Sequence, residues 1–313
     1  MVLVPVAGTI VLLLPVGEIN DACMSVIEHP VRAKALDLSS YPEGTPERPV
    51  HLLFMHHSCG GQLLAAPGPD VGTNSIHSTH PNGGGLRARL ENASYLVHEA
   101  SYDSRIGQAT DIFDWPPKFR DRMADILACD SQDLRHTNGR RNQIVVFKSC
   151  FPNNVFRSEG HAPGKAEGPD LTVWNAKAAY AALLPEFAKH PDVLFVCVTA
   201  PPLAPKSAPK PLWRQLVSMV RGPAYDAVEA ARLAREFNNW LVDQNGWLNT
   251  STLTNVVIFD YYDILTGEGV SNVSVYPTGD GFDSHPSSAG NQRAAEAFER
   301  FLNRAVRRAG ITP

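Results

Sequence analysis

From residue 50 onward, short apolar segments alternate with amphipathic helical patterns, and this alternation constrains the fold more than any other feature of the sequence. The apolar segments are rich in β-branched residues and have no polar face, which predicts strands that are buried on both sides. We expect five such strands, at residues 50–57, 94–100, 143–148, 193–199 and 255–261. The segments between them repeat their apolar residues at helical spacing, as helices that cover a parallel sheet do.

Amphipathic helices are predicted between and after these strands, at residues 116–129, 170–189, 225–243 and 287–308. Right-handed crossovers between parallel strands place such helices on both faces of the sheet. The predicted fold class is therefore α/β, a three-layer α/β/α sandwich around a doubly wound, flavodoxin-like sheet of five parallel strands. We expect one domain over residues 46–313, preceded by an extension over residues 1–45.

The extension leaves two interpretations open. Residues 1–17 carry no charge and contain the apolar run Ile10–Leu14, which resembles a secretory signal and would place the protein outside the cytoplasm. The first basic residue is Arg32, however, and two prolines interrupt the segment, which suits a buried strand or a truncated leader equally well. No other stretch approaches the ~18 apolar residues of a membrane span.

The charge and cysteine content exclude several classes of protein. A net charge of −4 over 313 residues, without a block of five like charges, gives no reason to expect nucleic acid or anionic lipid as a partner. Five cysteines without a Cys-x-x-Cys pair indicate neither a disulfide framework nor a structural zinc site. Cys59 and Cys150 follow neighbouring strands, and both a disulfide between them and two buried free thiols remain open.

Residues suited to nucleophilic catalysis follow the predicted strands, at the edge where an open parallel sheet binds its ligand. Ser58 follows the first strand, Gly107 the second and Asn153 the third, while His285 precedes the last helix. His285 could take the proton of the Ser58 hydroxyl and so activate it as a nucleophile. The Gly107 N–H and the Asn153 side chain could donate hydrogen bonds to an oxyanion. Asn154 and the glycines at 83–85 are the alternatives to these two donors.

The acid that would orient His285 has two candidates, because Asp283 lies two residues before the histidine and Asp280 five residues before it. We favour Asp283, with Asp280 as the alternative.

A metal cluster is a further candidate at these strand ends, with His56, His57, Cys59 and His285 as its ligands. Neighbouring residues at a strand end point to opposite sides, and the sequence contains no His-Glu-x-x-His motif. We therefore expect no metal and no cofactor.

These segments together resemble the SGNH (GDSL-type) hydrolase superfamily, of which the chain looks like a divergent member. The resemblance extends over residues 48–308 and is carried by residues 54–61 (FMHHSCGG), 147–154 (FKSCFPNN) and 283–291 (DSHPSSAGN). It implies that Ser58 is the nucleophile and His285 the base. It also implies an oxyanion hole formed by the Ser58 N–H together with Gly107 and Asn153.

The chain departs from the family pattern at three places. The family's Gly-x-Asn-Asp block is not preserved around Asn153 and Asn154. His56 and His57 stand where the family has Gly-Asp before the serine, and Phe282 stands at the family's usual position for the acid.

The resemblance implies a metal-independent serine esterase or acylhydrolase that cleaves a carboxylic ester of a small molecule or a carbohydrate. Two alternatives remain: an acyltransferase in which a loop excludes water, and a non-catalytic relative that binds a carbohydrate or another ligand. The long loops at 67–90, 154–170 and 201–222, the last with Trp213, are expected to form the walls of the pocket.

Overall fold

The computed structural model describes residues 36–69, 78–137, 139–168, 170–206 and 226–311. The signal-like segment at 1–17 and Trp213 lie outside the described residues, and so do parts of all three loops expected to form the pocket. Among the described helices, none is both long and apolar enough to cross a membrane.

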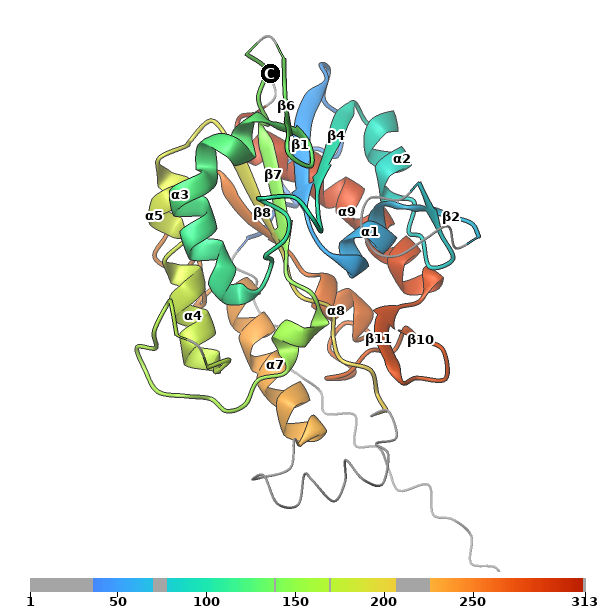
Figure 1. Cartoon of the computed structure of the whole chain (residues 1–313), viewed down its shortest axis with the longest axis vertical. Helices are drawn as coiled ribbons and strands as arrows, with labels where there is room; N and C mark the ends of the chain where they lie inside the picture. Colours follow the sequence, from blue (N-terminus) through green and yellow to red (C-terminus); the bar gives the residue numbers. More distant parts are fainter. Residues whose placement is uncertain (1–35, 70–77, 138, 169, 207–225, 312–313) are drawn as a thin grey trace, which may run out of the picture. The chain divides into compact units, whose positions relative to one another are not determined.

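A mostly parallel sheet of seven strands, in the order β6-β5-β4-β1-β7-β8-β9, forms the centre of the described chain (Figure 1). The strands are β1 (Val50–Met55), β4 (Tyr95–Ala100), β5 (Cys129–Ser131), β6 (Leu134–Arg135), β7 (Ile144–Lys148), β8 (Leu194–Val198) and β9 (Val256–Phe259). The five expected strands are adjacent and parallel, and their order β4-β1-β7-β8-β9 is that of a doubly wound sheet. The predicted α/β sandwich is therefore confirmed.

The predicted strand count of five is wrong, because β5 and β6 extend the sheet beyond β4. Strand β5 pairs with β4 in parallel, and β6 returns antiparallel to β5. These strands contain three and two residues, too few for an alternating pattern to appear in the sequence. Cys129, which we expected to end a helix, instead begins β5.

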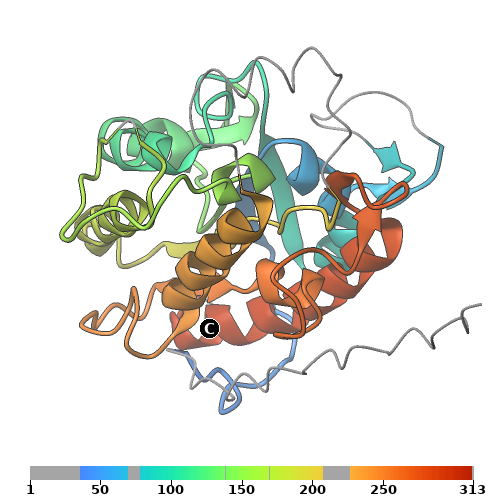
Figure 2. The ribbon, with the colours of Figure 1, turned by 90° about the horizontal axis from the view of Figure 1, so that it is seen from below.

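Helices cover both faces of the sheet (Figures 1 and 2). One face packs against α1 (Ser58–Leu64), α2 (Leu86–Asn92), α8 (Tyr261–Leu265) and α9 (Ser288–Arg308). The other packs against α3 (Trp115–Ala128), α4 (Val173–Ala181), α5 (Leu184–Ala188) and α7 (Ala227–Val242).

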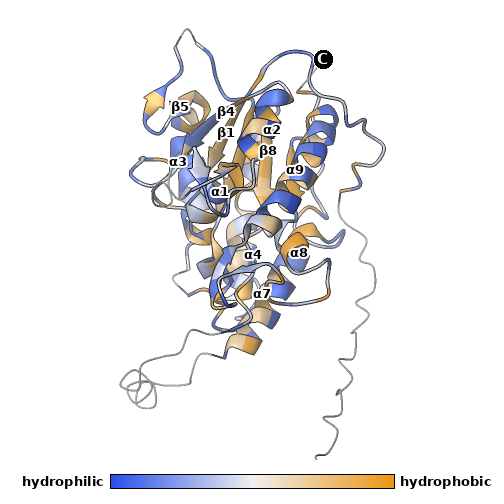
Figure 3. Ribbon diagram, turned by 90° about the vertical axis from the view of Figure 1, so that its right-hand side faces the viewer, coloured by the Kyte–Doolittle hydropathy of each residue, from blue (hydrophilic) through white to orange (hydrophobic). Residues whose placement is uncertain are grey.

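Successive side chains of β1 point to opposite faces of the sheet. Leu53 and Met55 pack in the core beneath α3, whereas Leu52 and Phe54 pack in the core beneath α9. β1, β7, β8 and β9 are accordingly apolar along most of their length, and the surface helices carry polar outer faces (Figure 3).

Two helical segments differ from the prediction. The single helix expected over 170–189 is divided into α4 and α5, because Pro185 has no N–H to donate and its ring disfavours a continuous helix. At the break, the Leu183 N–H bonds to the Tyr180 carbonyl, 3.1 Å away, in a tighter turn. The strand expected to run to Tyr261 ends at Phe259, and Tyr261 instead begins α8.

Short elements complete the carboxyl-terminal edge of the sheet. They are the ribbons β2 (Ala66–Pro67) with β3 (Thr79–His80) and β10 (Pro277–Thr278) with β11 (Asp283–Pro286), and the 3-10 turns η1 (Ile112–Asp114) and η2 (Phe151–Asn154). His285, expected in a loop, therefore lies on β11, which approaches α1.

Candidate active site

Ser58 is the first residue of α1, directly beyond the carboxyl end of β1, and it is only 6% exposed. Beneath it, the buried His56 imidazole bonds through Nδ1 to the His57 carbonyl (2.9 Å) and through Nε2 to Glu99 Oε1 (2.8 Å). Glu99 is also paired with Arg87. This buried network fixes the turn that presents the serine.

Gly60 allows α1 to pack against His56. A Cβ on Gly60 would lie 2.3 Å from the His56 Cβ, a distance that real contacts do not reach. We therefore expect Gly60→Ala to lower the free energy of unfolding by about 1–3 kcal/mol, the usual cost of overpacking. Urea denaturation followed by circular dichroism measures this.

The matched control for this change is Gly44→Ala, where the nearest atom to the added methyl is the end of the flexible Arg307 side chain, at 3.1 Å. Equal stability of the two variants would contradict the proposed packing constraint.

His285 lies between Ser58 and Asp283. Its Nε2 is 3.0 Å from Ser58 Oγ, and its Nδ1 is 2.7 Å from Asp283 Oδ1. The same carboxylate oxygen accepts the His285 backbone N–H at 2.9 Å. Because a carboxylate only accepts, Nδ1 carries the proton and Nε2 presents its lone pair to the serine hydroxyl. The His285 and Asp283 side chains are 24% and 49% exposed, so the pair is open to solvent.

Asp280, the alternative acid, lies elsewhere in the loop. Both ring nitrogens of His285 are already engaged, one by Asp283 and the other by Ser58. The Asp280 carbonyl accepts a hydrogen bond from Lys206 Nζ at 2.8 Å. The arrangement therefore favours Asp283 as the orienting carboxylate.

The N–H groups expected in the oxyanion hole already have acceptors. The Ser58 N–H donates to the Tyr102 hydroxyl (3.2 Å), and the Gly107 N–H donates to the Ser104 carbonyl and Oγ (both 3.2 Å). To bind an oxyanion, each N–H would have to exchange this acceptor for the substrate.

The two asparagines after β7 are also hydrogen-bonded. Asn153 Nδ2 donates to Asp111 Oδ1 (2.8 Å) and to the Cys150 carbonyl (3.3 Å), and its Oδ1 accepts the Ile112 N–H (2.8 Å). Asn154 is fully buried and bonds to the carbonyls of Ala200 and Pro201 and to the Asn238 side chain. Asn154 therefore braces the loop after β8, whereas Asn153 joins the loop of η1 to η2.

Tyr102 has a place in the site that its position in the sequence did not reveal. Its ring stacks on His57 at 4.0 Å between centroids, and His57 Nε2 bonds to the Gly107 carbonyl at 2.8 Å. Burial lowers the pKa of His57, which favours the neutral imidazole with its proton on Nε2. His57 thus holds the 101–107 loop against Ser58, and nothing in the spacing of that segment distinguishes Tyr102 beforehand.

Two cysteines lie directly against the serine hydroxyl. The sulfurs of Cys150 and Cys59 are 3.7 and 3.9 Å from Ser58 Oγ, and both residues are free thiols in the structure. The Cys59 thiol is hydrogen-bonded to Cys150, and the buried Lys148 Nζ lies 3.5 Å from Cys150 Sγ. The hydrogen bond from Cys59 and the Lys148 ammonium both hold the pKa of Cys150 below its ordinary value.

The candidate metal ligands next to Ser58 in the sequence have other partners in the structure. His56 bonds to Glu99, His57 to Gly107, and Cys59 to Cys150. In the part of the chain that the structure describes, the histidines with metal-ligand spacing are His51, His98 and His136, which belong to other segments.

Comparison with known proteins gave structural likenesses only. No family model and no curated protein sequence matches the chain. Among solved structures, a "putative acylhydrolase" from Bacteroides fragilis aligns over 85% of this chain and 92% of its own, at 13% identity and a TM-score of 0.42. A family two carbohydrate esterase from Clostridium thermocellum in complex with cellohexaose aligns over 82% of this chain and 64% of its own, at 14% identity and a TM-score of 0.34. At these values the likenesses alone assign neither family nor activity.

Proposed function

We propose that the chain is a serine hydrolase of the SGNH type that cleaves a carboxylic ester through an acyl-enzyme at Ser58. The observation that carries the proposal is the continuous hydrogen-bonded chain from Ser58 Oγ through His285 to Asp283. A nucleophile within reach of a base, which is itself oriented by a third group, is the arrangement that activates a serine hydroxyl.

In the first step, Ser58 Oγ attacks the ester carbonyl carbon while its proton passes to His285 Nε2. The electron pair of the carbonyl π bond moves to the oxygen, which becomes an oxyanion. When this intermediate collapses, the bond to the alcohol oxygen breaks and His285 returns the proton to the leaving alcohol. Asp283 stabilises the imidazolium that exists between these two transfers.

In the second step, water attacks the acyl carbon with His285 again as base, and the acid is released with Ser58 restored. The Ser58 N–H, Gly107 N–H and Asn153 amide are the proposed oxyanion donors, once their present acceptors are exchanged for the substrate. One such donor contributes typically about 3–4 kcal/mol to the transition state. The substrate class proposed is an ester of a small molecule or of a carbohydrate.

The direct experiment is labelling with a fluorophosphonate, followed by hydrolysis of p-nitrophenyl acetate and butyrate in the presence of a metal chelator. We expect one label per chain, mapped to Ser58 by mass spectrometry, and turnover that the chelator does not change. A folded protein that neither labels nor hydrolyses would instead be a ligand-binding relative. Transfer of the acyl group to an added alcohol in preference to water would indicate an acyltransferase.

The identity of the acid can be tested separately. We expect Asp283→Ala to lower kcat about 10- to 100-fold, less than the loss of a buried triad aspartate because this carboxylate is half exposed. Asp280→Ala is the matched control and should hydrolyse p-nitrophenyl acetate at the wild-type rate. The reverse ranking of the two variants would transfer the role to Asp280.

A further inference from the structure

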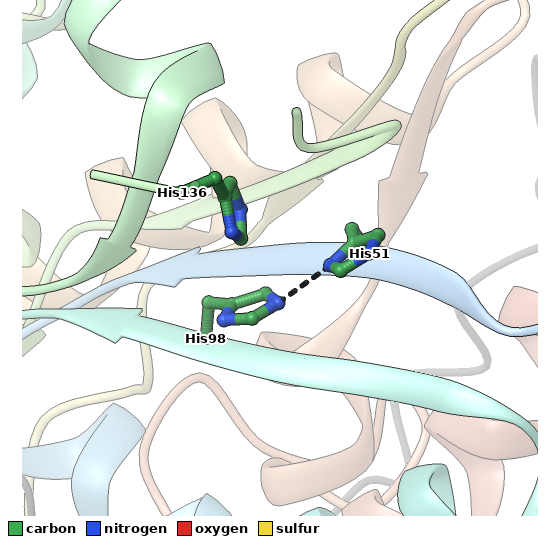
Figure 4. A group of neighbouring side chains, drawn as sticks. All are labelled: His51, His98 and His136. Carbon is green, nitrogen blue, oxygen red and sulfur yellow. Dashed lines mark hydrogen bonds between the residues drawn. The ribbon is translucent and has the colours of Figure 1, made fainter. Parts of the chain in front are cut away.

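Three imidazoles that take no part in the candidate active site lie close together across the sheet (Figure 4). They are His51 on β1, His98 on β4 and His136 just after β6. Their ring centroids lie 4.5–5.1 Å apart, and one nitrogen from each ring lies within 4.8 Å of the others. His51 precedes Ser58 by seven residues in the sequence. Seven residues of extended chain span about 20 Å.

The tautomer of His136 is set by a buried asparagine. Asn142 donates both hydrogens of its Nδ2 to the carbonyls of Ile126 (2.9 Å) and Cys129 (2.8 Å). Its Oδ1 must therefore accept a hydrogen bond, and the group facing it at 3.1 Å is His136 Nε2. The proton of neutral His136 is thus on Nε2. Its Nδ1 carries the lone pair that a cation could take, and this atom lies 3.6 Å from Asp130 Oδ1.

The tautomer of His98 is set in the same way by Asp130. His98 Nδ1 faces the Asp130 carbonyl at 3.0 Å and Asp130 Oδ1 at 2.9 Å, and both of these oxygens accept. The His98 proton is therefore on Nδ1, and its Nε2 lone pair points to His51 Nδ1 at 2.9 Å. A histidine ligand that donates its second N–H to a carboxylate or a carbonyl is typical of zinc sites.

We propose that His51, His98 and His136 bind a divalent transition-metal ion of the zinc class, with Asp130 as the acceptor that orients His98. Imidazole nitrogens suit Zn²⁺, and three protein ligands leave a position for water. Zn–N bonds of about 2.0–2.1 Å separate tetrahedral ligand atoms by about 3.3 Å, so small rotations of the rings would suffice. Binding replaces the His51–His98 hydrogen bond and requires His51 to carry its proton on Nε2.

The bound ion would also join strands that are weakly connected otherwise. β1 and β4 belong to the centre of the sheet, whereas β5 and β6 form a short edge hairpin of three and two residues. An ion held by His51, His98 and His136 would clamp that hairpin to the sheet. The site does not depend on the proposed hydrolysis.

The experiment is a titration of chelator-treated full-length protein with Zn²⁺, measuring bound zinc by elemental analysis and the Tm. We expect one ion per chain and a higher Tm with zinc. His98→Asn and, separately, His136→Asn should lose the bound zinc and the shift in Tm. Asp130→Asn should weaken binding about 10- to 100-fold, the usual effect of losing such an acceptor.

Two control variants exclude other histidines. His190→Asn changes a partly exposed histidine outside the cluster, and His285→Asn removes the imidazole beside Ser58; both should bind one ion as the wild type does. Comparison of circular dichroism spectra without zinc shows whether each variant is folded. Wild type without bound zinc, or unchanged binding in the folded His98→Asn and His136→Asn proteins, would overturn the proposal.

Discussion

Replacement of Ser58 by alanine should reduce kcat/KM for p-nitrophenyl acetate by at least about 1000-fold, because it removes the hydroxyl on which the proposed acyl-enzyme forms. The change removes one buried hydroxyl oxygen, which bonds to His285, and adds no atom. The fold should therefore persist, and activity should fall to the rate that binding and hydrogen-bond donors alone sustain. Initial rates, together with the loss of fluorophosphonate labelling, measure this effect.

Ser288→Ala is the matched control for Ser58→Ala. Ser288 is the first residue of α9, and its hydroxyl accepts a hydrogen bond from Gln292 on the exposed side of that helix. This variant should retain labelling and turnover. If Ser58→Ala kept more than a tenth of the wild-type rate, the nucleophile would have to be another group, and the adjacent Cys150 thiol would be the first to examine.

Replacement of His285 by alanine should have an effect of similar size, at least about 1000-fold on kcat, because the serine hydroxyl then has no base. Nucleophile and base act as one unit. The double variant Ser58→Ala/His285→Ala should therefore be no slower than the slower single variant. Kinetics of the three variants with p-nitrophenyl acetate test this non-additivity.

His161→Ala, at an exposed histidine, is the control for the loss of an imidazole. Multiplicative effects in the double variant would mean that Ser58 and His285 act independently, contrary to the proposed mechanism.

The central sheet could be predicted because four of its strands, β1, β7, β8 and β9, are buried on both faces. Each of the five expected strands is apolar over several consecutive residues, and the helices between them have one apolar side. The edge strands β5 and β6 could not be predicted, since two or three residues show no period. The division into α4 and α5 was open to prediction from Pro185, which lies within the amphipathic pattern.

Part of the candidate site could also be predicted, because it follows from the parallel sheet. Parallel strands end at one edge, so polar residues after them are expected to meet, and Ser58 and His285 lie 3.0 Å apart although 227 residues separate them. The distance in sequence from His285 does not decide between Asp283 and Asp280, because the path of β11 determines which of the two carboxylates reaches the imidazole. It also did not reveal Tyr102, whose contact with Ser58 comes from a different loop.

The sequence by itself determined the α/β class, the order of the main elements and the edge at which the serine lies, because these follow from local hydrophobic period and from chain connectivity. Only the tertiary structure decided which carboxylate faces His285, which N–H groups already have acceptors, and that His51, His98 and His136 meet. These three features depend on contacts between side chains that are far apart in the sequence. Such contacts do not repeat at regular intervals along the chain, so they give no periodic pattern from which to predict them.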